Sequence, residues 1–417
     1  MKPASPGAAP VRLARNRNYT LLWAGQACAE VGFSASMIPF PLLVLALTGS
    51  AAASGLVLAA DAVAQLVVGV PAGALVDRWN RKRIMLVCEA AQFLALGSLV
   101  VVILMDVPTI AHMVAVSVVM GVCRALFEPA EDASLPNIVP DSQLATAIAM
   151  NTARSSVGQM AGTALGGLLF AVGRWVPFLL DVVTHLIAFV AILFIRMPAR
   201  VVTPVADAHL GREILEGLRW VWSRREIRVT ALCVIALNLF FSAFYLVVIV
   251  LADRRGVPSA EIGIMAAMLG VGGVIGALLA PYLHRVLNPY ISIVGVFWAL
   301  TALAPVAVVV DNGYLMGLLF AGMALLAPTA NTTISTHQLL LTPDALRGRL
   351  SGVMNVVVGV SAALGPALGG LLVEAVSADN AVLVCAAGMA AVTVLVTINP
   401  TLRHYPKHAP EREETPT

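Results

Sequence analysis

The stretch GALVDRWNRKRIM, from Gly73 to Met85, lies between two long apolar segments, and five of its thirteen residues are charged. Only 12% of the whole chain is charged, so this cluster differs sharply from its surroundings. Its first residue has no Cβ atom, which allows a helix to approach a neighbour closely. Asp77 follows just past the end of the apolar segment. The segments on either side decide what kind of protein carries this loop.

The composition indicates a membrane protein. The chain has 417 residues, 59% of them hydrophobic, with a mean hydropathy of +0.89. One soluble core could not hide so much apolar surface, whereas about 20 apolar residues cross the hydrocarbon of a bilayer as a helix. The N-terminus is not a secretory signal, because the apolar run that follows it is far longer than an h-region and has no small-residue cleavage site. The five cysteines lie in apolar segments without CxxC spacing, which favours small buried side chains over disulfides.

Continuous apolar stretches predict twelve transmembrane helices and an all-α fold. In the first half they cover residues 19–47, 54–76, 84–105, 109–129, 142–172 and 175–197, and in the second half residues 227–252, 259–283, 290–310, 314–341, 345–375 and 381–402. A membrane β-barrel is excluded, because these stretches lack the alternation of its strands. We therefore expect a leader at 1–18, a six-helix bundle at 19–197, an amphipathic linker at 198–226, a second six-helix bundle at 227–402 and a tail at 403–417.

The basic residues predict the orientation of the chain. If the N-terminus is cytoplasmic, 21 of the 26 Lys and Arg residues lie on the cytoplasmic side. Only Arg174, Arg254 and Arg255 then lie on the opposite side, while Arg124 and Arg154 fall within spans. Such an asymmetry is the positive-inside pattern. We expect a multi-pass protein of the inner, cytoplasmic membrane with its leader, linker and tail in the cytoplasm.

Two sets of residues recur at one fixed shift, which indicates an internal duplication. Pro140 and Asp141 lie 203 residues before Pro343 and Asp344. The same shift carries the glycines of GTALGGLL onto those of GPALGGLL. We define the helix-packing motif as these glycines with two further residues, so that it comprises Gly158, Gly162, Gly166 and Gly167 in the first half and Gly365, Pro366, Gly369 and Gly370 in the second. Two like halves predict a pseudo-two-fold molecule that rocks between two open states. The glycines would then mark the surface where the halves move.

The loop between the second and third helices resembles the signature loop of the major facilitator superfamily. The matching residues are Gly73, Leu75, Asp77, Arg78, Arg81, Lys82 and Arg83. The segments NRNYTLLWAGQ, FEPAEDASLPNIVP and EILEGLRWVW resemble the branch of enterobactin exporters and macrolide or multidrug efflux pumps. Asn80 departs from the usual glycine, but Asn also tolerates a left-handed turn. Thr163 departs from the proline of the antiporter motif, whereas Pro366 keeps it.

The resemblance implies that the loop is a gate. Asp77 is expected to accept hydrogen bonds from the start of the eleventh helix, near Ala345. Arg81 is expected to pair with an acid at the inner end of the fourth helix, the candidates being Glu128, Glu131 and Asp132. Contacts of this kind form in one gating state and break in the other. The alternative is that the basic residues only obey the positive-inside rule. In the second half HRVLNPY, from His284, stands in place of the loop, so we expect no latch there.

Ionisable residues within the spans form the second candidate site. They are Glu30, Asp61, Glu89, Arg124, Arg154, Asp181, His185 and His337. By analogy with the superfamily, Glu30, Arg124, Arg154 and Asp61 are expected at the cavity, since intramembrane charges are costly and mark functional sites. Glu89, Asp181, His185 and His337 are expected to be structural. No spacing of His and acids suits a metal.

Glu30 is the expected proton carrier. It lies about 16 Å into the membrane at ~1.5 Å per residue, between Arg124 and Arg154 in depth. Desolvation favours a neutral carboxyl and a guanidinium favours the carboxylate, so a change in their distance would load and release a proton. The alternative is a permanent Glu30–Arg124 ion pair that only joins two helices.

The second half offers neutral polar and aromatic groups to a mostly apolar solute. We expect the substrate cavity to include Asn238, Phe241, Tyr245, Asn331, Gln338 and Asn355. The chain lacks a P-loop, HExxH and GxSxG, so neither ATP-driven transport nor a membrane enzyme is favoured. The resemblance therefore implies a monomeric, proton-coupled exporter of a small molecule, which needs the bilayer but no cofactor, metal or nucleic acid. Import of a small metabolite is the alternative.

Overall fold

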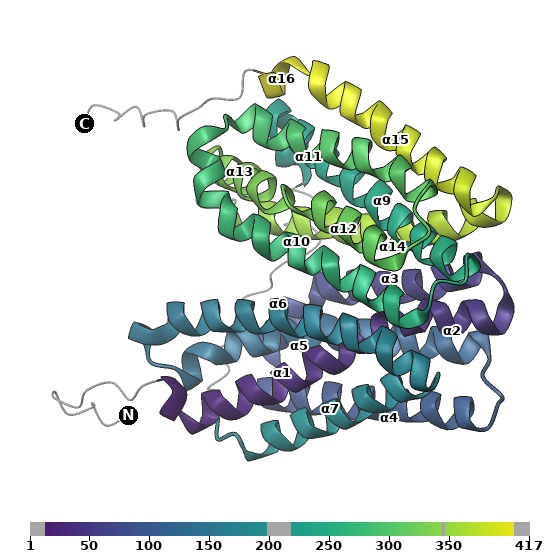
Figure 1. The fold of residues 1–417 in the computed structure, drawn as a ribbon. Helices are drawn as coiled ribbons and strands as arrows, with labels where there is room; N and C mark the ends of the chain where they lie inside the picture. The colour runs from purple at the N-terminus through teal and green to yellow at the C-terminus, as the bar shows by residue number, and fades with distance from the viewer. Residues whose placement is uncertain (1–12, 198–217, 343–346, 404–417) are drawn as a thin grey trace, which may run out of the picture.

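The computed structural model describes residues 13–197, 218–342 and 347–403 (Figure 1). Within these residues, twelve helices are long and apolar enough to cross a membrane. This confirms the predicted all-α, twelve-span fold. The predicted leader, linker and tail lie mainly outside the described residues.

Seven helices and a short 3-10 turn make up the first half. They are η1 (Leu13–Arg15), α1 (Arg17–Met37), α2 (Pro39–Thr48), α3 (Ala51–Arg78), α4 (Arg81–Leu104), α5 (Ile110–Ile138), α6 (Asp141–Val172) and α7 (Val176–Phe194). The first span runs through α1 and α2. It is broken at Pro39, because proline has no backbone N–H to donate to the preceding turn.

The second half repeats this arrangement. Its elements are α9 (Arg225–Arg254), α10 (Ser259–Val286), α11 (Pro289–Leu303), η2 (Ala304–Val308), α12 (Gly313–Ala324), α13 (Ala327–Leu340), α14 (Arg347–Ala375), α15 (Ala378–Ile398) and α16 (Pro400–Arg403). One span consists of α11 with η2, and another runs through α12 and α13.

Asn80, inside the signature loop, is the N-cap of α4. Its side chain accepts a hydrogen bond from the backbone N–H of Arg83 at 3.1 Å. The backbone of Asn80 is extended, with φ −72° and ψ 111°. The expected left-handed turn is therefore wrong: the residue that replaces glycine caps a helix, a role for which Asn is well suited.

The two halves meet through two pairs of helices, α3 against α14 and α6 against α10 (Figure 1). Each pair joins the second span of one half to the fifth span of the other, as a pseudo-two-fold arrangement requires. At α6 a side chain on Gly167 would collide with the backbone of Ser259 and Gly263, and at α14 one on Gly370 would collide with Ala51. These two glycines, related by the repeat, let the halves touch closely.

The other glycines of the packing motif lie within a half. Gly162 and Gly166 pack against α1 at Val31 and Ala35, and Gly369 packs against α9 at Ala243. The expectation that the whole motif marks the surface between the halves is therefore wrong. Glycines on one helix face serve packing within a half, and only the face that carries Gly167 or Gly370 serves the contact between halves.

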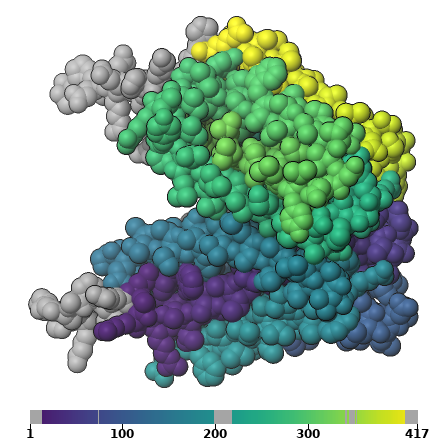
Figure 2. Space-filling model, in the orientation of Figure 1, coloured from purple at the N-terminus to yellow at the C-terminus, as the bar shows by residue number. Residues whose placement is uncertain are grey.

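A cleft separates the halves at one end only. Figure 2 shows it open at the end where α1 begins and α16 lies, and closed at the opposite end. At the closed end the hydroxyl of Ser50 donates to the Glu374 carboxylate, which also accepts the backbone N–H of Ala52 at 3.1 Å. The molecule is thus in a state with access from one side.

Candidate functional site

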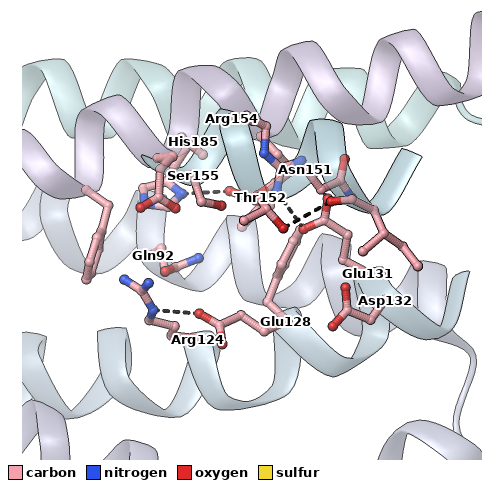
Figure 3. Close-up of a pocket in the computed structure, with 17 residues that line it drawn as sticks. Gln92, Arg124, Glu128, Glu131, Asp132, Asn151, Thr152, Arg154, Ser155 and His185 are labelled. Carbon is pink, nitrogen blue, oxygen red and sulfur yellow. Dashed lines mark hydrogen bonds and ion pairs between the residues drawn. The ribbon is translucent and has the colours of Figure 1, made fainter. Parts of the chain in front are cut away.

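A cavity of about 480 Å³ lies inside the first half, on the wall of the cleft. It is formed by α1, α4, α5, α6 and α7. Its polar lining consists of Gln26, Glu30, Glu89, Gln92, Arg124, Glu128, Glu131, Asp132, Asn151, Thr152, Arg154, Ser155 and His185 (Figure 3). Three of the four predicted cavity residues, Glu30, Arg124 and Arg154, are therefore brought together here.

Arg154 of α6 pairs with Glu131 of α5 inside this cavity. Its Nη1 lies 2.7 Å from Oε1 of Glu131 and its Nη2 lies 3.1 Å from Oε2, a two-point contact (Figure 3). The two side chains are 7% and 8% exposed. Two parallel charge-assisted bonds fix the geometry of both groups. Glu131 is a predicted partner of Arg81 in the gating loop, but in this state it pairs with Arg154 of α6.

Arg124 is held by its own helix and by α1. Its Nε lies 2.8 Å from Oε1 of Glu128, one helical turn away. Its guanidinium lies 4.4 Å from the centre of the Phe33 ring, a cation–π contact. This pair is more exposed than Arg154–Glu131, with side chains 32% and 57% accessible. It is therefore the easier of the two to rearrange.

Glu30 lies between these two basic groups without an ion pair to either among the described residues. Both guanidinium groups are within electrostatic range of its carboxylate. Its side chain rests against Gly158 of α6, where any larger residue would collide with it. The alternative of a permanent Glu30–Arg124 ion pair is not what the structure shows, since Arg124 binds Glu128.

Asp61 of α3 lies beside this cavity and is not part of its lining. Its backbone carbonyl packs against Gly121 of α5, and its carboxylate is within electrostatic range of Arg124. The sequence could place Asp61 in a span, but not on a particular wall.

Three other ionisable residues form a buried cluster at the back of the cavity. His185 Nδ1 lies 2.6 Å from Oε2 of Glu89, and His185 Nε2 lies 3.3 Å from Oδ1 of Asp181. Gln26 of α1 donates to Oε1 of Glu89 at 2.8 Å. The one-turn spacing of Asp181 and His185 is visible in the sequence. The contact with Glu89, which is 96 residues away, is not.

The gating loop makes its contacts at the open end of the cleft. Asp77 Oδ1 lies 3.6 Å from Nη2 of Arg81, and Nη1 of Arg81 donates to the carbonyl of Ala133 on α5. Lys82 Nζ donates to the carbonyls of Leu193 and Ile195 at 2.9 and 2.7 Å, where a cation suits the end of α7. The expected contact of Asp77 near Ala345 lies outside the described residues.

Gly73 is not in close contact with a neighbour. A side chain there would meet open space, because Gly73 lines a second cavity of about 740 Å³ between α3, α5 and α14. The expected close approach at this glycine is therefore absent in this state. Glu128 and Asp132 line both cavities, so the two spaces are neighbours within the cleft.

The second half does carry a counterpart of one loop contact. His284 stands at the position of Arg81, shifted by 203 residues. Its Nε2 lies 3.1 Å from the carbonyl of Thr329 on α13 and 3.2 Å from Oγ1 of Thr333. His284, in the last turn of α10, is thus tied to the fourth span of its half, as Arg81 at the start of α4 is tied to α5. The absence of a gating latch in the second half stays a prediction.

The predicted substrate residues of the second half lie in different surroundings. Asn355 lines the second cavity, and Tyr245 lines a third of about 450 Å³ between α1, α6, α9 and α10. Phe241 stacks on Tyr245 with ring centres 6.4 Å apart. Gln338 is wrong as a cavity residue: it is 4% exposed and donates to Thr230 of α9 at 2.9 Å, so it joins two helices.

Asn238 and Asn331 line none of the cavities described above. Asn238 donates to the carbonyl of Val234 on its own helix at 2.9 Å. Asn331 is exposed. Their amide groups are visible in the sequence, but the side of the helix that faces a cavity is set by packing.

The comparisons with known proteins agree with this architecture. The family described as transmembrane secretion effector matches residues 7–414. The multidrug efflux pump Tap of Mycolicibacterium fortuitum is 25% identical over 395 residues, which are 90% of this chain and 94% of the pump. The enterobactin exporter EntS of Escherichia coli O1:K1 is 26% identical over 309 residues, 72% of each chain. The crystal structure of the nucleoside transporter NupG has the same fold, with a TM-score of 0.74, 13% identity, and coverage of 93% of this chain and 99% of its own.

Proposed function

The chain belongs to the transmembrane secretion effector family of the major facilitator superfamily, and from this premise we propose that it exports a mostly apolar small molecule in exchange for protons. It is a multi-pass membrane transporter and not an enzyme. The relatives Tap and EntS are named for the export of drugs and of a siderophore. A solute of comparable kind is the substrate that we infer for this chain.

The single observation that carries the proposal is the cavity of Glu30 on the wall of a one-sided cleft. An acid lies between two guanidinium groups, each of which is already engaged by another carboxylate. Glu30 therefore keeps its freedom to take up a proton, since no other described residue forms an ion pair with it. A shift of α1 against α5 during the cycle would change the distance of Glu30 from Arg124, and with it the balance between the charged and neutral forms.

The cleft supplies the space for the solute. The cavity between α3, α5 and α14 measures about 740 Å³, which falls in the usual range of sites for drug-sized ligands. It is lined mostly by small and apolar residues, with Gln65, Glu128, Asp132 and Asn355 as its polar groups. Few hydrogen bonds and a large apolar wall suit a mostly apolar solute.

The direction of opening follows from the charge distribution. If the side rich in Lys and Arg is cytoplasmic, the open end of the cleft faces the cytoplasm, and the Ser50–Glu374 contact closes the outer face. The described state is then inward-open, ready to take up a solute from the cell. Release outside requires that contact to break and the gating loop to close.

Transport by purified protein in proteoliposomes tests the proposal. Ethidium and a labelled macrolide serve as probes, each with and without an imposed pH gradient. We expect solute movement opposite to the proton gradient, and counterflow of labelled against unlabelled solute without one. Solute accumulation in the same direction as the proton gradient would instead support an importer. Movement that ignores the gradient in all conditions would contradict proton coupling.

A further inference from the structure

The cluster of Glu89, His185 and Asp181 is not used by the proposed cycle, yet it holds two acids and an imidazole in the membrane. The three residues are 1%, 3% and 0% exposed, respectively. Glu89 comes from α4, whereas His185 and Asp181 come from α7. Charges at such depth are costly and are retained where they have a function or a full set of partners.

The geometry favours at least one additional proton in the cluster. The imidazole of His185 has a carboxylate at each nitrogen, 2.6 Å from Nδ1 and 3.3 Å from Nε2. A neutral imidazole has one N–H and so can donate to only one of the two acids. Nε2 has no well-formed hydrogen bond among the described residues. A charged imidazole or a protonated acid would satisfy the approach of Nε2 to Asp181.

The partners of the two acids are unequal. Glu89 accepts a hydrogen bond from Gln26 and lies close to Nδ1 of His185. Neither oxygen of Asp181 has a well-formed hydrogen bond within the described part of the chain, although both are buried. A buried carboxylate without donors is unfavourable. Protonation would therefore stabilise Asp181 more than Glu89, because it removes a buried charge that has no well-formed hydrogen-bond donor among the described residues.

The three groups also lie at different depths. Glu89 and His185 line the cavity, whereas Asp181 lies behind them. Asp181 is about 8 Å from the start of α7, which is at the closed end of the molecule, and Glu89 is about 12 Å from the start of α4, at the open end. The cluster thus runs from the open cavity toward the closed face.

We propose that Glu89, His185 and Asp181 form a proton relay and storage site that is separate from Glu30. The idea rests on the proposed exchange of solute for protons. In the relay a proton on Glu89 moves to Nδ1 of His185 while the Nε2 proton moves to Asp181. This leaves Glu89 ionised, the imidazole neutral with its proton on Nδ1, and Asp181 protonated. The reverse transfer returns the proton to the cavity.

Other titratable groups surround the relay and share the cavity with it. They are Glu30 on α1, Arg124, Glu128, Glu131 and Asp132 on α5, and Arg154 on α6. The thiols of Cys88 on α4 and Cys123 on α5 lie beside Glu89. The two guanidinium groups are occupied by Glu128 and Glu131. Neither guanidinium group therefore neutralises Glu89 or Asp181, and protons within the cluster are left to do so.

A purely structural clamp is the competing account. Glu89 and His185 alone would join α4 to α7, and a second buried acid would add only cost. In addition, Asp181 faces Gly32 of α1, where any side chain would collide with it. A shift of α1 against α7 would therefore change the surroundings of Asp181 directly, which a proton store needs and a clamp does not.

Infrared difference spectroscopy of the parent protein in proteoliposomes, between acid and alkaline buffer, tests the site without any transported solute. We expect a band of a protonated carboxyl in an apolar environment, which is lost in Asp181→Asn and kept in the control Glu261→Gln. Glu261 lies in the second half, where it accepts the N–H of Gly313. An unchanged band in Asp181→Asn would overturn the proposal.

Isotope labelling covers the case in which Asp181→Asn fails to fold. With carbon-13 in the aspartate carboxyls of the parent protein, we expect this band to shift. A band that shifts only with labelled glutamate would overturn the proposal. A parent protein that moved neither ethidium nor the macrolide would contradict the proposed function. The infrared spectra need no solute, so they would still decide whether Asp181 stores a proton.

Discussion

The guanidinium of Arg154 on α6 makes a two-point contact with the carboxylate of Glu131 on α5, at 2.7 and 3.1 Å, inside the cavity of the first half. These residues are 23 positions apart. Both side chains are nearly inaccessible, so each neutralises a charge that the membrane interior would otherwise have to bear.

Loss of one partner of this ion pair should destabilise the protein. Glu131→Ala leaves the Arg154 guanidinium buried and uncompensated, so we expect a loss of about 3–5 kcal/mol, as for other broken buried pairs. The double variant Glu131→Leu with Arg154→Met removes both charges and should lose much less. Thermal unfolding of the purified protein in detergent measures both. A single variant as stable as the parent would show that the pair carries little stability.

Glu30→Gln should separate proton coupling from solute binding. The amide keeps the shape of the side chain next to Gly158 but can no longer ionise. We expect pH-gradient-driven transport to fall at least about tenfold, equivalent to ~1.4 kcal/mol, while exchange of labelled solute without a gradient persists. Gln159→Ala, at a residue that lines the neighbouring third cavity, serves as the control. Unchanged gradient-driven transport in Glu30→Gln would remove Glu30 from the mechanism.

The gating loop should matter for transport and not for insertion. Arg81→Ala removes the hydrogen bond to the carbonyl of Ala133, and Asp77→Asn weakens its attraction to Arg81. Each should reduce the transport rate several-fold at normal amounts in the membrane. Arg83→Ala, at an exposed position of the same loop, is the matched control. If all three variants transported at the parental rate, the loop would be only a topological signal.

The orientation of the chain can be read by chemical labelling in intact cells. In a background without the five native cysteines, Ser223→Cys should resist a membrane-impermeant thiol reagent, because the basic residues place it in the cytoplasm. Val107→Cys, in the exposed connection between α4 and α5, should react. The reverse pattern would invert the topology and the assignment of the open end of the cleft.

A larger residue at Gly167 should shift the balance between the two open states. Gly167→Val would collide with the backbone of Ser259 and Gly263, so the halves could no longer close at that end. We expect reduced transport and greater labelling of cysteines introduced near the Ser50–Glu374 contact. Gly97→Val, at a helical position with open space around it, is the control. Equal labelling in both variants would show that this contact does not hold the closed end.

The internal register of the repeat shows what a sequence can reveal about contacts. The shift of 203 residues that relates Gly167 to Gly370 is visible in the chain, and both do lie between the halves. Gly162 and Gly365 share that shift but pack within their own halves. A small residue permits a close approach, but the neighbour is decided by which helix face is turned outward.

The predicted cavity residues show the same limit, because the sequence does not specify their neighbours on other helices. Glu30, Arg124 and Arg154 do share one cavity, where the resemblance to the superfamily leads us to expect them. Their partners do not follow from the sequence: Arg124 binds Glu128 one turn away, and Arg154 binds Glu131 on another helix. Partner choice depends on distances of a few ångströms between helices, which a periodic pattern does not contain.

The sequence by itself determined the twelve spans, the duplication and the signature loop, because insertion into a bilayer depends on the hydropathy of each segment and repeats persist as local similarity. Only the tertiary structure decided that His185 lies between Glu89 and Asp181, that Gln338 joins two helices, and that the cleft is open at one end. These features depend on how helices rotate about their axes and cross one another. In an almost uniformly apolar helix, hydropathy does not specify that rotation, and close packing between helices does.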